Sequence, residues 1–141
     1  MKFTPIKNQE FFSKPEGGLW GSPVDCAFGW KQWCEESKFN DCSEDNAFRF
    51  TLSDSANILI VNSANDLNGL PINEPPIPIS IWISLDFEKL LENGIDAIQV
   101  NMSNDNSNGK WGERLYNKLY GWDCDAILVM NKKVIIDDLL N

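Results

Sequence analysis

Two aspartates in the last fifth of the chain have the spacing of a small acidic site. Asp123 and Asp125 are separated by one residue and stand just before residues 126–130, the most apolar run in the sequence. On an extended chain, residues i and i+2 point to the same side, so both carboxylates can face one ligand. A partly desolvated carboxylate stabilises the positive charge that develops on a ribose ring when its glycosidic bond breaks. A turn or capping role before a strand is the alternative interpretation.

Lys14 is the residue that we expect to meet an anionic group of a ligand. It stands shortly before Gly17-Gly18, and a backbone without side chains lets a ligand approach closely, so we assign Gly18 to the same binding site. Five aromatic residues could stack a flat ring such as nicotinamide or adenine: Trp20, Trp111, Tyr116, Tyr120 and Trp122. A solvated lysine, an ordinary glycine turn and aromatic core residues are the alternatives.

Several common kinds of chemistry are excluded by residue type. The sequence has no His, which rules out Ser-His-Asp and Cys-His catalysis and any metal site that needs a His ligand. The four cysteines lack the C-x-x-C spacing of zinc sites, so we expect reduced thiols and no bound metal. Neither a G-x-x-x-x-G-K-[ST] phosphate loop nor a G-x-G-x-x-G motif occurs. Carboxylates, Lys, Arg or Tyr must therefore supply the chemistry.

The charge balance disfavours nucleic acid as a partner. The 21 acidic residues outnumber the 12 basic ones, and the formal net charge of -9 repels a phosphate backbone. A local basic spot can still hold one phosphate-bearing ligand, because distant carboxylates are screened over roughly 10 Å of salt solution. No stretch reaches the roughly 18 apolar residues of a membrane span, and the N-terminus has no apolar signal region. We expect a cytoplasmic protein, delivered elsewhere only if it is an effector, with a single domain over residues 1–141.

The helix signals are capping residues followed by apolar residues at helical spacing. Ser22-Pro23 predicts a helix over residues 23–38, and Ser84 predicts a second one over 85–92 that ends at Asn93-Gly94. Shorter helical segments are expected over residues 63–67 and 111–120.

Strands are expected over residues 47–52 and 58–61, joined as a hairpin, and over 95–100, 126–130 and 134–136, with 126–130 at the centre. The proline cluster at 71–78 is expected to be a covering loop. The Asn-rich segment 101–110 is expected to be a mobile surface loop. The resulting fold class is α+β, with compact mixed sheets and a few short helices.

The order of these pieces resembles the compact ADP-ribosyltransferase family. The resemblance rests on a Lys-bearing first strand, a Gly-Gly-Leu-Trp-x-Ser strand, a helix, the stretch G-I-D-A-I, and finally D-x-D-A-I-L-V-M-N-x-x-V-I. It spans most of the chain. It implies a mixed α/β fold with NAD bound in a cleft and transfer of ADP-ribose to a protein or other acceptor.

The resemblance also implies roles for individual residues. Lys14 matches the basic or His residue of the family's first strand, Ser22 falls near its second-strand Ser or Thr, and Asp125 matches its late acid. The Asp123-x-Asp125 pair resembles the family's Glu-x-Glu or Gln-x-Glu pair, with Lys replacing His or Arg and Asp replacing Glu. Nicotinamide would stack near Trp20 or Tyr116, Asp125 would contact the nicotinamide ribose, and Asp123 would orient or deprotonate the acceptor.

Two other functions fit the same residues. One is a non-catalytic interaction or inhibitor protein that keeps the fold and binds a partner through its acidic surface. The other is an NAD glycohydrolase, which uses the same site with water as the acceptor. Release of nicotinamide, measured with and without an acceptor, distinguishes these functions.

Overall fold

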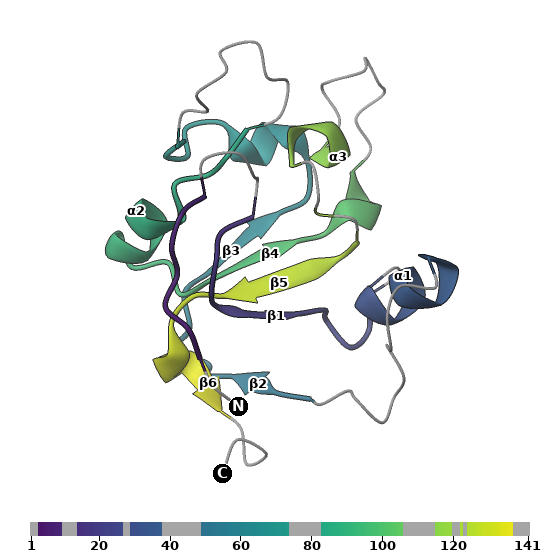
Figure 1. The fold of residues 1–141 in the computed structure, drawn as a ribbon, viewed down its shortest axis with the longest axis horizontal. Helices are drawn as coiled ribbons and strands as arrows, with labels where there is room; N and C mark the ends of the chain where they lie inside the picture. Colours follow the sequence, from purple (N-terminus) through teal and green to yellow (C-terminus); the bar gives the residue numbers. More distant parts are fainter. Residues whose placement is uncertain are drawn as a thin grey trace.

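The chain has a mixed α+β fold built on a four-stranded and a two-stranded sheet (Figure 1). The computed structural model describes residues 3–9, 14–26, 29–37, 49–73, 83–105, 115–119, 122 and 124–136. The larger sheet has the order β1-β5-β4-β3, with β1 at Leu19–Gly21, β5 at Ala126–Val129, β4 at Ala97–Val100 and β3 at Ile58–Val61. The smaller sheet pairs β2, Thr51–Leu52, with β6, Ile135–Ile136. Only β3 and β4 run parallel within these sheets.

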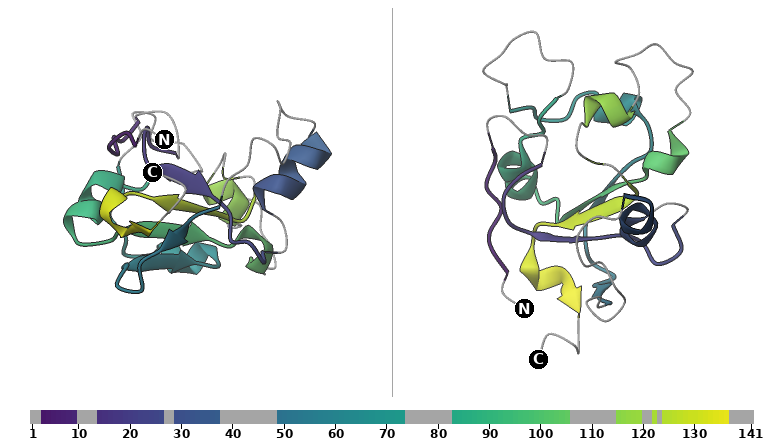
Figure 2. Two further views of the ribbon diagram at one scale, coloured as in Figure 1. Left: turned by 90° about the horizontal axis from the view of Figure 1, so that it is seen from below. Right: turned by 45° about the vertical axis from the view of Figure 1, so that its right-hand side comes forward.

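Short helices lie around the larger sheet. The α-helices are α1 (Trp30–Ser37), α2 (Phe87–Glu92) and α3 (Leu115–Lys118), and the 3-10 turns are η2 (Ala64–Leu67), η3 (Met102–Asn104) and η4 (Lys132–Val134). Figure 2 shows from two further directions that α1 and α2 lie beyond opposite ends of the sheet. None of the helices in the described part of the chain is long and apolar enough to cross a membrane.

The larger sheet is covered on both faces, as the alternation of its side chains requires. Ile98, Val100 and Leu128 point into one apolar cluster that includes Phe87 of α2 and Leu115 of α3. Side chains on the other face, from Leu19, Ala97 and Val129, pack with Val134 of η4, with Leu52 of β2 and with Phe50 just before β2. All four residues of β5 are buried, and β5 lies between β1 and β4, so its predicted central position is confirmed.

The prediction that the first helix begins at Pro23 is wrong, because α1 begins at Trp30. Ser22 does cap this helix, but its hydroxyl accepts the backbone N–H of Trp30 at 2.9 Å rather than one near Pro23. Residues 23–26 form a tight turn instead, in which Cys26 N–H donates to Pro23 O. Gly29 permits the close approach that this requires, because a Cβ there would lie 2.6 Å from Cys26 Sγ.

The predicted hairpin between residues 47–52 and 58–61 is also wrong. A tight turn does follow β2, with Ala56 N–H donating to Ser53 O, but the two strands belong to different sheets. β3 pairs in parallel with β4, and β2 pairs with β6 at the far end of the chain. The partner of each strand is chosen by burial of its side chains in the tertiary structure, which a local turn signal does not report.

The second helix is capped by a different residue from the one predicted. Asp86, not Ser84, is the N-cap of α2, since its carboxylate accepts the N–H of Lys89 at 3.0 Å. Ser84 is buried, and its carbonyl accepts the N–H of Asn73. The predicted end at Asn93-Gly94 is confirmed, with Gly94 at a φ of 93°, where glycine is favoured.

The remaining predictions for the connections have mixed outcomes. The predicted turn at 63–67 is confirmed as η2, where Asp66 accepts the N–H of Ser63. The segment predicted as a surface loop contains η3, and residues 101–105 make defined hydrogen bonds, while Ser103 and Asn104 are exposed as a surface loop would be. Residues 106–110 and most of the proline cluster lie outside the described residues.

Candidate functional site

The end of the sheet where β1 runs beside β5 brings two predicted site residues together. Gly21 pairs with Ile127, so the residues that follow β1 and precede β5 meet at one edge of the sheet. Ser22 Oγ donates a hydrogen bond of 2.7 Å to the carbonyl oxygen of Asp125, 103 positions away in the sequence. The antiparallel register of this strand pair thus produces the contact.

Ser22 joins three elements at this edge. Its hydroxyl donates to Asp125 O at the start of β5 and accepts the N–H of Trp30 at the start of α1. A hydroxyl has one donor and two acceptor positions, so these two bonds use its hydrogen and one lone pair. Any ligand contact of Ser22 in this arrangement must therefore be donated by the ligand.

Lys14 lies over two indole rings on the same side of the molecule. Its Nζ is 5.1 Å from the ring centroid of Trp20 and 5.2 Å from that of Trp30. Both distances fall within the range of cation–π attraction, which is worth about 0.5–1 kcal/mol at exposed sites and about 2 kcal/mol when desolvated. The two rings therefore hold the ammonium group of Lys14 close to the start of α1, where Ser22 accepts the N–H of Trp30.

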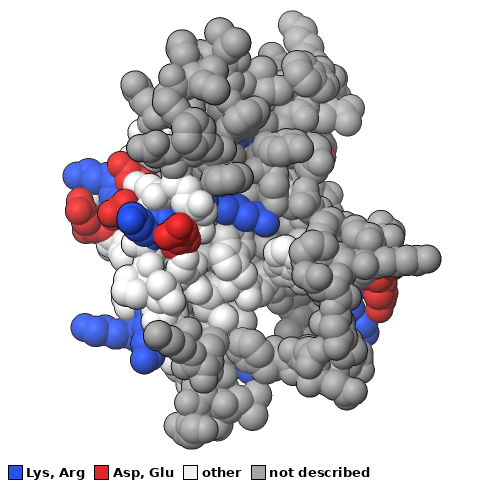
Figure 3. Space-filling model, viewed as in Figure 1, with Lys and Arg blue, Asp and Glu red and all other residues white. Residues whose placement is uncertain are grey.

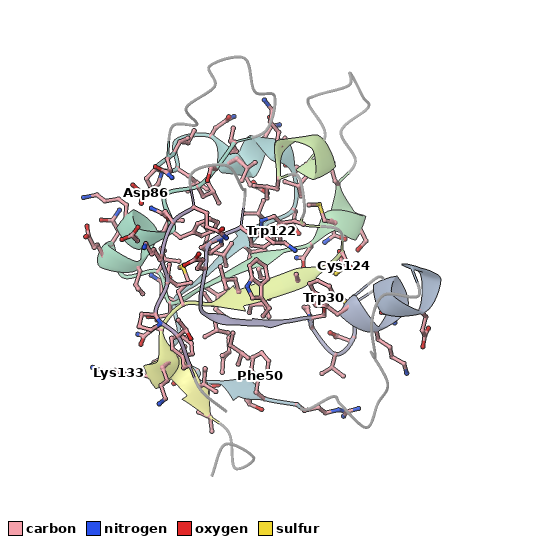
Figure 4. All side chains as sticks on the ribbon, in the orientation of Figure 1. Trp30, Phe50, Asp86, Trp122, Cys124 and Lys133 are labelled. Carbon is pink, nitrogen blue, oxygen red and sulfur yellow. The ribbon has the colours of Figure 1, made fainter. Side chains whose placement is uncertain are left out.

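Trp20 connects this site to the core. Its ring contacts Trp122 edge-on at a centroid distance of 4.8 Å, and Trp122 stacks in turn on Phe87 at 6.4 Å. Trp122 is only 1% exposed, so it belongs to the core rather than to a ligand surface. Trp20 is half-buried and has contacts with both the core and Lys14. Figure 4 shows Trp30 and Cys124 on the side where β5 begins, and Lys133 beyond the other end of the sheet.

Gly18 lies at the opposite end of β1 from Ser22. It has a φ of 74°, and a Cβ there would lie 2.7 Å from Leu128 Cδ1 and 2.9 Å from Val129 O. Its N–H donates to Thr4 O. The space that the missing side chain leaves is thus filled by the protein's own core, and the structure does not bring Gly18 together with Asp125.

The carboxylate of Asp125 is buried and hydrogen-bonded. The residue is 1% exposed, and its Oδ1 accepts the N–H of Ser103 at 2.8 Å while its Oδ2 accepts the Oγ hydroxyl of Ser103 at 2.6 Å. Bonds of this length to an ionised oxygen are stronger than bonds between neutral groups. Asp125 therefore tethers η3 to the start of β5.

Ser103 was missed by the sequence reasoning. It lies in the Asn-rich segment, and nothing in its neighbours indicates a partner. The signal that could have found it is the strand pairing, because Val100 opposite Ala126 brings the residues beyond β4 near those before β5. That signal appears only when residues 95–100 and 126–130 are paired antiparallel.

A group of side-chain amides lies beside Ser103. Asn62, which follows β3, accepts the amide groups of Asn101 and Asn104 on one oxygen, at 2.9 and 3.0 Å. Gln99 Nε2 donates to Asn101 Oδ1. These bonds attach η3 to the ends of the parallel strands β3 and β4.

Charge and metal ligands add little to the site. Figure 3 shows acidic and basic side chains next to each other at the α2 side of the molecule, where Lys89 Nζ lies 3.8 Å from Glu92 Oε2. Within the described ranges, no group of three His, Cys, Asp or Glu side chains could hold a metal ion. Asp123 and the side chain of Tyr116 lie outside the described residues.

We name the group of Lys14, Trp20, Ser22, Trp30 and Asp125 the β1/β5 corner. Its chemical elements are one ammonium, two indoles, one hydroxyl and one buried carboxylate. Comparisons of the chain with protein-family models, with curated proteins and with solved structures gave no match. Inferences about function therefore rest on the residues of this corner.

Proposed function

We propose that the chain binds NAD at the β1/β5 corner and transfers ADP-ribose to an acceptor, which we expect to be a protein. The observation that supports this proposal is the proximity of four separately predicted residues. Ser22 bonds the backbone of Asp125 and of Trp30, and Lys14 lies over Trp20 and Trp30. A cation, flat aromatic rings and a carboxylate are the groups that a dinucleotide with a departing nicotinamide requires.

The proposed binding roles follow from the chemistry of each side chain. Lys14 would donate hydrogen bonds to a phosphate oxygen of NAD, because an ammonium group is a compact point charge with rotatable donors. Trp20, or Tyr116 of α3, would stack the nicotinamide ring. Gly18 would act indirectly, since its lack of a side chain leaves room for Leu128 and Val129 at the start of β1.

In the proposed reaction, the bond between nicotinamide and C1′ of its ribose breaks, and nicotinamide leaves with the bonding electron pair. The carboxylate of Asp125 would stabilise the oxocarbenium-like ribose that forms. The acceptor then attacks C1′, and Asp123 would take the proton that the acceptor loses. The products are nicotinamide, the ribosylated acceptor and one proton.

The test is a titration of NAD by calorimetry, followed by measurement of nicotinamide release and mass spectrometry of candidate acceptors. We expect Lys14→Ala to weaken NAD binding about tenfold or more, since a charged contact to phosphate is lost. We expect Asp125→Ala to lower release far more than binding, because its contact strengthens in the transition state. Equal losses of release and binding in Asp125→Ala contradict the assigned role.

Matched controls come from the surface far from the site. Lys132 and Asp54 are both exposed, and each lies in a turn outside the β1/β5 corner. Lys132→Ala and Asp54→Ala should leave NAD binding and nicotinamide release unchanged. Release without modification of any acceptor would identify an NAD glycohydrolase instead of a transferase.

A second candidate function is a non-catalytic interaction protein, and one observation favours it. The carboxylate of Asp125 is 1% exposed and already accepts two hydrogen bonds from Ser103. In this arrangement a ligand cannot reach it directly. The net charge of -9 suits binding of a basic partner protein. Neither NAD binding nor nicotinamide release is expected in this case.

A further inference from the structure

β3 is an edge strand of the larger sheet, and its outer side has no strand partner in the described part of the chain. It pairs with β4 on its inner side (Figure 1). Asn57 O and Val61 O accept N–H groups of β4 and of the residue that follows it. Backbone groups alternate in direction along a strand, so the N–H and C=O of Ile58 and Ile60 point away from β4. No described residue bonds these groups, which we name the β3 edge.

The sequence around the β3 edge lacks the residues that normally prevent strand edges from pairing, which are charged residues and Pro. Residues 55–65 contain neither, and β3 itself is Ile-Leu-Ile-Val. The side chain of Ile60 is 50% exposed. The next outward N–H along the chain, that of Asn62, is by contrast covered by the carboxylate of Asp66 at 2.8 Å. The chain thus covers its own edge after β3 and leaves β3 itself open to a further strand.

We propose that the β3 edge pairs with β3 of a second copy of the chain, antiparallel across a two-fold axis. The β3 edge is self-complementary, because Ile58 of each copy can exchange both backbone hydrogen bonds with Ile60 of the other. Leu59 then lies on the axis, opposite Leu59 of the second copy. Every side-chain pair formed by these residues is apolar, and such cross-strand pairs stabilise a sheet. The two four-stranded sheets become one continuous sheet. The proposal does not depend on NAD binding.

The charges near the β3 edge set the length and the strength of this pairing. Asp54 and Asp66 are the nearest charged residues on either side of β3. In the antiparallel register, Asp54 of one copy and Asp66 of the other come to the same end of the strand pair. Their repulsion, together with the net charge of -9 on each copy, limits pairing to the uncharged segment and is screened by salt. The contact is smaller than a standard interface of about 1,600 Å², so we expect a weak dimer that salt strengthens.

The first experiment measures the mass of the full chain by sedimentation equilibrium, over a concentration series in low and high salt with a reductant present. Ile60→Lys should weaken dimerisation about tenfold or more, although it lowers the net negative charge, because it replaces an apolar pair by a charge at the edge. Ile60→Pro should have a similar effect, since it deletes an outward N–H that β4 does not use. Val24→Lys, at an exposed apolar position outside β3, is the matched control.

The result of this experiment decides the proposal. Circular dichroism and urea unfolding show whether each variant keeps its fold, and Ile60→Lys decides the outcome if Ile60→Pro does not fold. A wild type that stays monomeric up to millimolar concentration overturns the proposal. So does a dimer that folded Ile60→Lys leaves unchanged, or one that Val24→Lys weakens equally. Protection of the Ile58 and Ile60 amides from hydrogen exchange by an added acceptor protein, in a monomeric chain, would assign the edge to that protein instead.

The second experiment tests the register by cysteine cross-linking under mild oxidation, read on a non-reducing gel. Leu59→Cys places a thiol opposite itself across the axis, where Cα atoms are about 4.5 Å apart and a disulfide can form. Asn57→Cys lies opposite Val61 of the second copy and cannot reach its own counterpart. Random collisions would favour Asn57→Cys, because position 57 is the more exposed. We expect a covalent dimer in Leu59→Cys well above the level in Asn57→Cys and in the wild type, which controls for the native cysteines. Equal or weaker cross-linking in Leu59→Cys overturns the proposed pairing.

Discussion

Asp96 and Asp125 occupy equivalent places at opposite ends of one strand pair. Each stands one residue before its strand, Asp96 before β4 and Asp125 before β5, and the two strands run antiparallel. Asp96 Oδ2 accepts the N–H of Asn57, and its Oδ1 accepts the side-chain amide of Asn131, at 2.8 and 2.9 Å. Its carbonyl also accepts the N–H groups of Met130 and Asn131.

The difference between the two aspartates lies in how their described partners are distributed. Asp96 is partly exposed and ties its strand to two separate segments, so moving one segment leaves the other bond intact. Asp125 is buried, and its carboxylate accepts both the N–H and the Oγ hydroxyl of Ser103, which lies in an exposed turn. The two aspartates thus differ in burial and in the segments that they bond, and the proposed function assigns a catalytic role to Asp125 alone. Four changes test this contrast.

The largest effect is expected for the charge of Asp125 on nicotinamide release. Asp125→Asn should lower release by about a hundredfold to a thousandfold, as loss of one electrostatic contact to a transition state does. Asp96→Asn should leave release within about threefold, since Asp96 lies at the other end of the sheet. The measurement is steady-state release from NAD. Equal losses in both variants would mean that the two ends do not differ in function.

The largest effect on stability is expected for Gly18→Ala. Gly18 stands just before β1, at the end of the sheet where Asp96 precedes β4. The added methyl would stand 2.7 Å from Leu128 Cδ1, and the φ of 74° is strained for alanine. We expect a loss of about 2–4 kcal/mol in the free energy of unfolding, measured with urea. Gly69→Ala is the control for backbone strain alone, because Gly69 has a φ of 82° with open space around it. A loss no greater than in this control would argue against the packing role of Gly18.

Asp96→Ala should destabilise the fold by about 2 kcal/mol, because two donors lose a charged acceptor. The free energy of unfolding in urea measures this loss. Asp54→Ala, in the exposed turn after β2, should change stability little. If Asp125→Ala costs as much stability as Asp96→Ala and leaves nicotinamide release intact, Asp125 is a structural residue like Asp96.

The smallest effect is expected for Ser22→Ala, which removes the hydroxyl between α1 and β5. Its hydroxyl accepts the first N–H of α1, as an N-cap side chain does, so we expect a loss of about 1 kcal/mol and fraying of the first turn of α1. Circular dichroism would show the lost helix, and urea unfolding the lost stability. Ser55→Ala, in an exposed turn outside the corner, is the matched control. Unchanged helix content in Ser22→Ala would show that α1 is held by packing alone.

Local signals in the sequence predicted the elements whose ends are set by their own residues. Gly94 ends α2 because its φ of 93° favours glycine, and Ser63 precedes η2 as its N-cap, with its N–H donated to the carboxylate of Asp66. The apolar run at 126–130 predicted the buried strand β5, because a strand that is buried on both faces consists almost entirely of apolar residues. Each of these predictions needed only neighbouring residues.

The predictions that failed depend on residues distant in the sequence. Ser22 caps α1 eight residues further on, because β5 fixes its hydroxyl from the other side. The partner of β2 is β6, more than eighty residues away in the chain, which no turn signal can indicate. At the candidate site, Asp125 was predicted but its contact with Ser103 was not, because that contact exists only once β4 and β5 are paired.

The position of β5 in the larger sheet has a consequence for biosynthesis. β5 is the last of the four strands along the chain, yet it pairs with both β1 and β4. While the ribosome still holds residues 126–129, β1 lacks the one neighbour with which it pairs in this sheet, and only β3 and β4 can associate. The sheet therefore closes after translation of its final strand, and apolar side chains such as Leu19 and Trp20 stay accessible to chaperones until then.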